Sequence, residues 1–236
     1  MFWENIKLRH FYILVFFASF GTAQIPVKEF QEQDFEETKY ASYEYHKTIP
    51  KEIRKQALMA LSYYPELKNI DITFRLRKKI TPLTSRPRII GVFQKKKNRR
   101  YVITISTQTN SKLAPILFSN LPYNAQVGVL GHELGHIVTY NTKNTFQIIG
   151  LSFKILKPKF VDSFEFNTDK ICIEHGLGYQ LYDWSRYVRK ALNIVAWKGA
   201  PGGVPVTADD TENQRYMNPE TIMQYIRSTS LYQDIN

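Results

Sequence analysis

The chain has 236 residues, of which 43% are hydrophobic, 14% aromatic and 22% charged. This is the composition of an ordinary globular protein, and it excludes collagen-like, low-complexity and wholly disordered chains. The formal net charge of +11 indicates anionic partners without naming one, and the single cysteine, Cys172, excludes a disulfide framework and a cysteine-rich zinc finger.

Residues 1–23 have the pattern of a secretory signal peptide. Lys7 and Arg9 precede an uninterrupted apolar run over 11–20, and the small residues GTA end the segment. The apolar run is about half as long as the ~20 residues that a membrane-spanning helix needs. We therefore expect the protein to be exported, either to the periplasm or as a secreted protein, with no transmembrane span in the mature chain.

The first half of the mature chain predicts one helix and three strands. Residues 24–49 are acidic and lack periodicity, so we interpret them as a solvated lead-in to a single domain over 50–236. Apolar residues at steps of three and four favour an amphipathic helix over 50–64. The sequence KKKN before Arg99 predicts a hairpin turn between the last two strands. The expected strands are Ile70–Leu76, Arg88–Phe93 and Tyr101–Thr107.

The second half predicts helices over most of its length. A Gly/Pro-bearing loop at 199–217 precedes a last short helix, which Asn218 caps and Pro219 begins. Cys172 lies in an apolar stretch, where a buried, inert thiol is expected. The longer helices expected, in order, are 122–140, 145–157, 158–175 (closed by Gly176) and 179–197.

The sequence HELGH at 132–136 is an HExxH motif inside the expected 122–140 helix. Two histidines four residues apart project from one face of a helix, a spacing that suits two imidazoles on one zinc ion. Glu133 stays beside the metal, where its carboxylate can take a proton from zinc-bound water. The alternative is a surface helix with two histidines and no metal, but the apolar flanks of the motif indicate a central helix. We expect His132 and His136 to bind one zinc ion per chain and Glu133 to be catalytic.

A hydrolytic zinc site needs a third protein ligand and a position open to water. The metzincin pattern is excluded because Thr139 and Thr142 stand where it requires glycine and histidine. The downstream sequence EFNTD offers Glu165 and Asp169 one helical turn apart. We expect Glu165 to be the third ligand and Asp169 to accept a hydrogen bond from the free ring nitrogen of a ligating histidine.

With HExxH followed by ExxxD, the sequence resembles the gluzincin zinc metallopeptidases, the thermolysin-like clan. EFNTD is also similar to the motif of the HtpX and CAAX-prenyl-protease group, although Thr168 replaces the usual alanine of that group. The resemblance implies an α+β, zincin-like fold: an N-terminal helix and a small mixed sheet pack on the HExxH helix, and a mainly helical C-terminal subdomain follows. It also implies that an edge strand runs along the active-site cleft, where a peptide substrate adds as an extra strand.

Two alternatives concern individual residues of this site. Glu174 and His175 are rival third ligands, but neither has a carboxylate one turn onward, and a solvated pair at the helix end is the favoured interpretation. The resemblance also implies a His or Tyr that stabilises the oxyanion. The sequence does not select among the candidates for that role, which are His175, Tyr182, Arg215 and Tyr216.

The basic excess is concentrated in one part of the chain. Residues 72–132 contain 12 Lys or Arg and no Asp or Glu. A solvated, solubilising surface is the simplest interpretation. The alternative is attraction of acidic peptides or of anionic components of the cell envelope. Nucleic acid is not expected as a partner, since no stacking signature or known binding motif is present.

Three functions fit these residues. The first is an exported zinc metalloendopeptidase, a hydrolase that cleaves a protein or peptide substrate with water activated by Glu133. The second is a non-catalytic zinc-binding envelope protein, which is a degenerate peptidase. The third is an amidase that acts on cell-wall crosslinks by the same chemistry. All the chemical groups that a peptidase requires are present, so the first function is the leading hypothesis.

Overall fold

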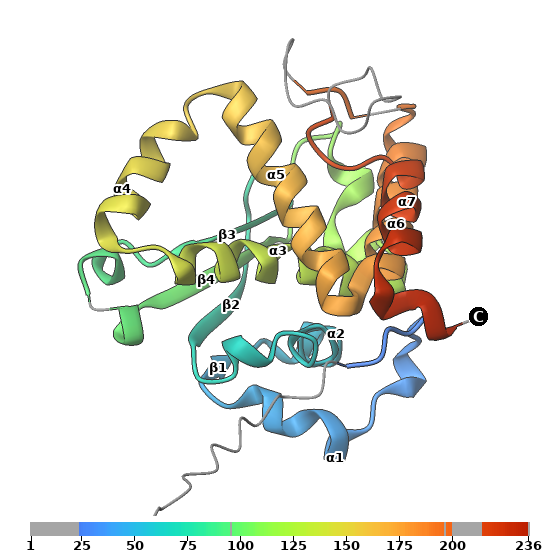
Figure 1. The fold of residues 1–236 in the computed structure, drawn as a ribbon, viewed down its shortest axis with the longest axis horizontal. Helices are drawn as coiled ribbons and strands as arrows, with labels where there is room; N and C mark the ends of the chain where they lie inside the picture. The colour runs from blue at the N-terminus through green and yellow to red at the C-terminus, as the bar shows by residue number, and fades with distance from the viewer. Residues whose placement is uncertain (1–23, 95, 196, 200–213, 236) are drawn as a thin grey trace, which may run out of the picture.

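The computed structural model describes residues 24–94, 96–195, 197–199 and 214–235 of the chain (Figure 1). The expected signal peptide at 1–23 and most of the expected loop at 199–217 lie outside these residues. The described part is an α+β structure that combines a small mixed sheet with a larger set of helices.

Four strands form the sheet, in the order β1-β2-β4-β3. β1, β2 and β4 run parallel to one another, whereas β3 is antiparallel to β4 and forms an edge. Along β2, the buried Ile72 and Phe74 alternate with the partly exposed Thr73 and Arg75, so one face of the sheet packs on the core and the other carries polar and basic side chains. The strand bounds are Lys47–Thr48 (β1), Asp71–Arg77 (β2), Leu83–Pro87 (β3) and Arg100–Ser106 (β4).

The strand expected at Arg88–Phe93 is wrong, and so is the hairpin turn expected before Arg99. The antiparallel partner of β4 is β3, which ends where the expected strand would begin. The apolar residues of Ile90–Phe93 form a 3-10 turn instead, since the N–H of Val92 bonds back to the carbonyl of Ile89 at 3.3 Å and the N–H of Gln94 to that of Gly91 at 3.1 Å. A second 3-10 turn at Lys96–Asn98 replaces the hairpin. Proline in β3 obscures the strand in the sequence, although an edge strand tolerates it.

The helices expected in the second half are confirmed, with boundaries that shift by a few residues. Asn144 caps α4 by accepting a hydrogen bond from Gln147 N–H at 2.9 Å. Gly176, at a φ of 96°, closes the turn that follows α5, and Asn193, at a φ of 52°, ends α6 earlier than expected. The longer helices are Arg54–Leu61 (α2), Tyr123–Thr142 (α3), Thr145–Lys154 (α4), Pro158–Cys172 (α5), Gly178–Leu192 (α6) and Pro219–Ser228 (α7).

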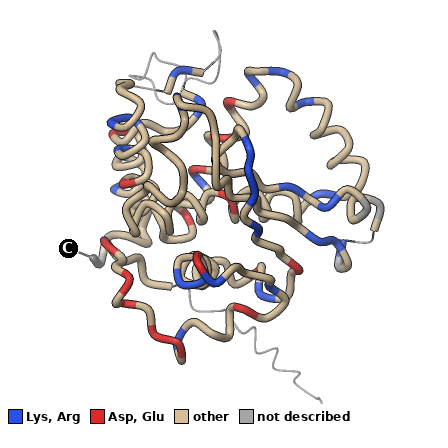
Figure 2. Tube along the Cα trace, turned by 180° about the vertical axis from the view of Figure 1, so that it is seen from behind, with Lys and Arg blue, Asp and Glu red and all other residues tan. Residues whose placement is uncertain are grey.

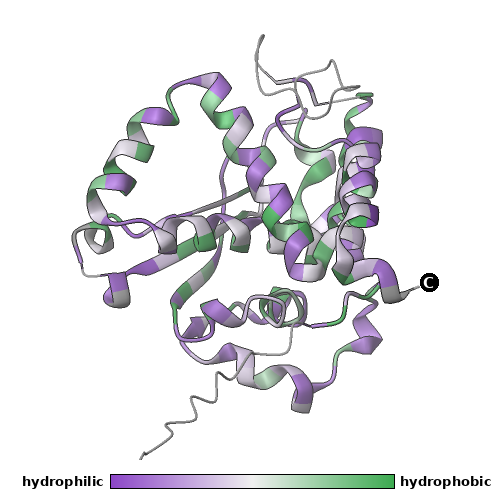
Figure 3. Cartoon of the chain, viewed as in Figure 1, coloured by the Kyte–Doolittle hydropathy of each residue, from purple (hydrophilic) through white to green (hydrophobic). Residues whose placement is uncertain are grey.

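α3 is the central helix of the molecule and packs against α2, α5, α6 and β3 (Figures 1 and 3). Two of its glycines permit this close packing. A Cβ at Gly128 would clash with the backbone of Gln180 in α6, and a Cβ at Gly135 would lie 3.1 Å from the side chain of Thr168 in α5. α3 therefore brings the HExxH motif against both the edge strand and α5.

The segment 24–49 lies against the body of the protein rather than apart from it. Phe30 and Tyr40, the last residue of α1 (Glu37–Tyr40), are buried in the core. Arg54 of α2 forms ion pairs with Glu37 and Glu44 at 2.6 and 2.7 Å. Much of the acidic character of this segment is thus used in pairing with the domain.

Candidate metal centre

The HExxH residues lie on the buried side of α3. The exposed fractions of His132, Glu133 and His136 are 2%, 5% and 6%. The two imidazole rings project from one face, with ring centroids 4.8 Å apart and planes nearly perpendicular. Burial of two histidines and a glutamate in one turn of a central helix is costly unless each finds a partner.

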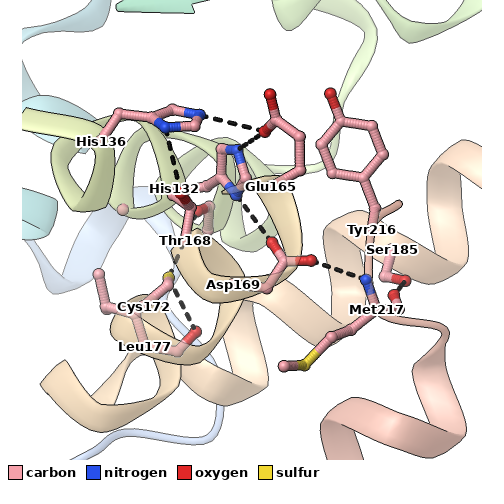
Figure 4. A network of polar contacts seen from close by, with 12 residues as sticks. His132, His136, Glu165, Thr168, Asp169, Cys172, Leu177, Ser185, Tyr216 and Met217 are labelled. Carbon is pink, nitrogen blue, oxygen red and sulfur yellow. Dashed lines mark hydrogen bonds and ion pairs between the residues drawn. The ribbon is translucent and has the colours of Figure 1, made fainter. Parts of the chain in front are cut away.

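Glu165 of α5 supplies the carboxylate that faces both rings (Figure 4). Its Oε2 atom lies 3.1 Å from Nε2 of His132 and 3.1 Å from Nε2 of His136. The three ligand atoms all lie within 4.8 Å of one another. Ligands of a tetrahedral zinc ion are separated by about 3.3 Å, given bonds of about 2.0–2.1 Å. The His132–His136–Glu165 group is therefore close enough to hold a metal ion.

The other ring nitrogen of each histidine has its own partner. Nδ1 of His132 lies 2.7 Å from Oδ1 of Asp169. Nδ1 of His136 lies 3.1 Å from the hydroxyl of Thr168, which in turn donates to the carbonyl of Phe164 at 2.8 Å. Since that hydroxyl uses its proton on the carbonyl, it accepts from the imidazole N–H. Both rings are thus held with Nε2 directed toward Glu165, the arrangement in which Nε2 can bind a metal.

The charges in this group alter each other's ionisation. Burial alone would lower the pKa of His132, but hydrogen bonds and charge from Asp169 and Glu165 outweigh burial and raise that pKa to about 10. Burial would raise the pKa of Glu165, yet the two imidazoles outweigh it and hold that pKa well below its ordinary value. Without a metal, the two carboxylates therefore favour the protonated form of the imidazole of His132.

Glu133 lies beside this group without taking part in it. Its Oε2 atom is buried and has no hydrogen-bond partner among the described residues. Burial raises the pKa of its carboxyl group, an effect that the nearby His136 and His132 partly offset. Glu133 lines a cavity of about 170 Å³ together with Leu83 and Ser85 of β3. A buried carboxylate with an oxygen that lacks a partner can accept a proton from a molecule that enters the cavity.

Tyr216 forms another wall of the site. Its ring centroid lies 5.7 Å from that of His132, and burial together with the charges of Glu165 and Glu133 raises the pKa of its phenol well above the ordinary value. Tyr216 and Trp184 also line an apolar cavity of about 190 Å³, which reaches Glu133. The phenol therefore stays protonated and can donate a hydrogen bond.

The remaining candidates from the sequence lie elsewhere. His175 is stacked on Tyr64 and bonded to Glu66 at 2.7 Å, and Glu174 is half-exposed beside Lys170. Arg215 pairs with Asp162 at 2.6 Å, and the ring of Tyr182 lies against the guanidinium of Arg186. Cys172 is fully buried, as expected. Neither rival ligand belongs to a metal-binding group within the described residues.

Comparisons of the chain with protein-family models, with curated proteins and with solved structures find no match. The functional argument therefore depends on the residues of the site. Two residues beside the expected ones were not predicted from the sequence: Thr168, which bonds to His136, and Ser85, which lines the cavity. The sequence signal for Thr168 was its place one residue before Asp169, where the similar motif has alanine.

Proposed function

We propose that this protein is an exported zinc-dependent metallopeptidase. One observation carries the proposal: a single carboxylate oxygen of Glu165 faces Nε2 of both His132 and His136, and each Nδ1 is held by a separate partner. Two nitrogens and one oxygen at this spacing match the three-protein-ligand set of catalytic zinc sites. The export part of the proposal depends on the sequence pattern of residues 1–23 alone.

A bound zinc ion would polarise the scissile carbonyl and make a water molecule acidic near neutral pH. In this proposal Glu133 is the general base. Its side chain lines the cavity beside the metal ligands, its buried Oε2 has no hydrogen-bond partner among the described residues, and its raised pKa moves its proton affinity toward the working pH. In this role Glu133 takes a proton from the attacking water and delivers it to the leaving amine.

Tyr216 is the best-placed donor to the developing oxyanion. Among the four candidates from the sequence, it alone lines both cavities at Glu133, and its phenol stays protonated. A hydroxyl that donates to the carbonyl oxygen as charge develops stabilises the transition state more than the substrate.

The edge strand β3 offers a docking site for an extended peptide. The carbonyl of Pro82 accepts a hydrogen bond from the N–H of Ser106, and the N–H of Arg88 donates one to the carbonyl of Arg100. In β3 the residues with even numbers therefore direct their backbone hydrogen-bonding groups toward β4. The backbone groups of Leu83 and Ser85 therefore point away from β4, toward the free edge, beside Glu133. A peptide strand that pairs there would pass the metal ligands.

Such a peptide would alternate its side chains between two different surroundings. One set would face the apolar cavity at Trp184 and Tyr216. The other set would lie on the outer face of the sheet beside Arg86, close to Arg75 and Lys79. Opposite charges on neighbouring strands attract, so this surface favours acidic side chains at alternate positions of the substrate.

Peptide hydrolysis by the purified, zinc-loaded protein tests this proposal. A peptide library should be cleaved, cleavage should stop on chelation and return with zinc, and acidic residues should be enriched near the cleaved bonds. Glu133→Gln should lower turnover at least about a hundredfold while zinc content stays the same. Glu174→Gln, at a half-exposed glutamate outside the site, is the matched control and should keep full activity.

Two outcomes would reject the proposal in different ways. If the wild type binds zinc but cleaves no peptide, the protein is a non-catalytic zinc-binding protein. If mass spectrometry shows cleavage of cell-wall crosslinks and not of peptides, the same chemistry serves an amidase.

A further inference from the structure

The outer surface of α4 carries large apolar side chains that no part of the described chain covers. Phe146, Phe153 and Leu156 are 84%, 68% and 78% exposed, and Ile149 is partly exposed between them. The spacing of these four residues, at steps of three and four, places them on one side of α4 and of the turn after it. We call these four residues the outer stripe.

The opposite side of α4 packs against the rest of the protein. Ile148 and Leu151 are buried, and the hydroxyl of Thr145 donates to the carbonyl of Val92 at 2.9 Å. Figure 1 shows α4 and the start of α5 as an arch at the side of the molecule, and Figure 3 shows apolar residues along it. The outer stripe is therefore not needed to fold the arch, and exposing it costs solubility.

The charged residues in the stretch of chain that carries the outer stripe are all positive. Residues 134–161 contain four lysines and no aspartate or glutamate. Three of the lysines, Lys154, Lys157 and Lys159, are exposed at the end of α4 and the start of α5. Acidic residues gather instead on the far segment around α1 (Figure 2). Apolar side chains with flanking lysines suit the boundary between the headgroups and acyl chains of an anionic bilayer.

We propose that the outer stripe docks the protein on the surface of a membrane that contains anionic phospholipids. The apolar side chains would enter the boundary region while the lysine ammonium groups remain among the phosphates. Within the described residues, no helix has the length and apolar character to cross a bilayer, so the contact is interfacial. A second copy of the chain fits less well, because two arches face to face would bring their lysines together.

Docking there would place the metal ligands close to the membrane. Glu165 lies seven residues after Pro158, about 10 Å along α5. Phe160 and Phe164 stack in series toward His136, and Ile155 and Val161 line the cavity beside Glu165. The inference does not depend on hydrolysis, because membrane binding is measured without a substrate.

Vesicle flotation tests the inference with the full mature chain. Vesicles of phosphatidylcholine mixed with phosphatidylglycerol should carry the wild type upward, and vesicles of phosphatidylcholine alone should carry it at least about tenfold less. Replacing Phe146, Phe153 and Leu156 together by Gln should weaken binding to the mixed vesicles by about tenfold or more. The matched control is Ile25→Gln, since Ile25 is 75% exposed outside the arch. Circular dichroism should show that each variant is folded.

The inference is overturned if the wild type binds neither vesicle, or if the triple variant binds as well as the wild type. The second result would assign binding to the basic face of the sheet. It is also overturned if sedimentation shows a dimer that the triple variant abolishes, because the outer stripe would then be a contact between two copies.

Discussion

The Nδ1–H group of His132 donates to Oδ1 of Asp169 at 2.7 Å, and the other oxygen of Asp169 accepts from the N–H of Met217, also at 2.7 Å. One buried carboxylate therefore joins α3, α5 and the segment that carries Tyr216 (Figure 4). It fixes the tautomer of a proposed metal ligand and the position of a proposed oxyanion donor at the same time.

Asp169→Asn should weaken both functions of this carboxylate. An amide replaces one accepting oxygen with a donor, so either His132 or Met217 loses its partner. We expect zinc affinity to fall about tenfold to a hundredfold and the free energy of unfolding to fall by about 1–3 kcal/mol. Competition with a chromophoric chelator and urea unfolding measure the two effects. The control is Asp71→Asn, at a partly exposed aspartate on β2, which should change neither quantity. If Asp169→Asn binds zinc as tightly as the wild type, Asp169 does not support His132 as a metal ligand.

Thr168 should support the second histidine through its hydroxyl group. Thr168→Val keeps the shape of the side chain against Gly135 but removes the acceptor for Nδ1–H of His136. Zinc affinity should fall by about tenfold in the Val variant, whereas Thr168→Ser, which keeps the hydroxyl, should bind zinc almost as tightly as the wild type. If the Val variant binds more tightly than the Ser variant, Thr168 serves only to pack the helices.

Tyr216→Phe should slow hydrolysis without releasing zinc. In the proposed mechanism the phenol donates to an oxygen that gains charge only in the transition state, so its loss should reduce kcat by about a hundredfold with little change in KM. Steady-state kinetics on a cleaved peptide measure this split. Tyr182→Phe is the control, since Tyr182 lies beside Arg186 instead of the metal ligands. A change in KM alone would assign Tyr216 to substrate binding.

The pair of His175 and Glu66 should make stability depend on pH. Burial lowers the pKa of His175, but the hydrogen bond and charge of Glu66 outweigh burial, so the pKa is raised overall. Burial raises the pKa of Glu66, but the hydrogen bond and charge of His175 outweigh burial, so the pKa is lowered overall. The histidine contribution is full below about pH 6.5 and is lost as pH rises through its raised pKa. The glutamate contribution is full above about pH 4.5 and is lost as pH falls through its lowered pKa.

A double-mutant cycle with His175→Gln and Glu66→Gln measures this coupling. Because the pair is partly exposed, we expect a coupling free energy of about 0.5–1 kcal/mol near pH 5.5 and almost no coupling near pH 9. Urea unfolding at the two pH values gives the coupling, and other titrating groups cancel in the cycle. A coupling that is the same at both values would show that the pair is not ionic.

The sequence predicted the parts of this structure that depend on local periodicity. The HExxH helix and the helix that carries Glu165 follow from apolar spacing, Pro and Gly, and each lies within a few residues of its expected place. Glu165 could be named as the expected third ligand because an i, i+4 pair of carboxylates has few uses on a buried helix. The spacing of residues in the sequence was thus enough to predict that His132, His136 and Glu165 lie together.

The parts that the sequence did not predict depend on contacts between distant segments. β3 is short and contains proline. It forms a strand because it pairs with β4 at the edge of the sheet and packs against α3. Thr168 gains its role only when α5 lies against Gly135. Tyr216 could not be chosen over Tyr182, since both are tyrosines near helices and only the packed structure places one of them beside His132.

The metal content of the purified protein tests the central claim most directly. Elemental analysis of the wild type should give one zinc ion per chain, and Glu165→Ala, which removes the oxygen shared by both Nε2 atoms, should give close to none while remaining folded. A wild type that retains no zinc after purification in its presence, or a Glu165→Ala variant that retains as much as the wild type, would contradict the three-ligand site.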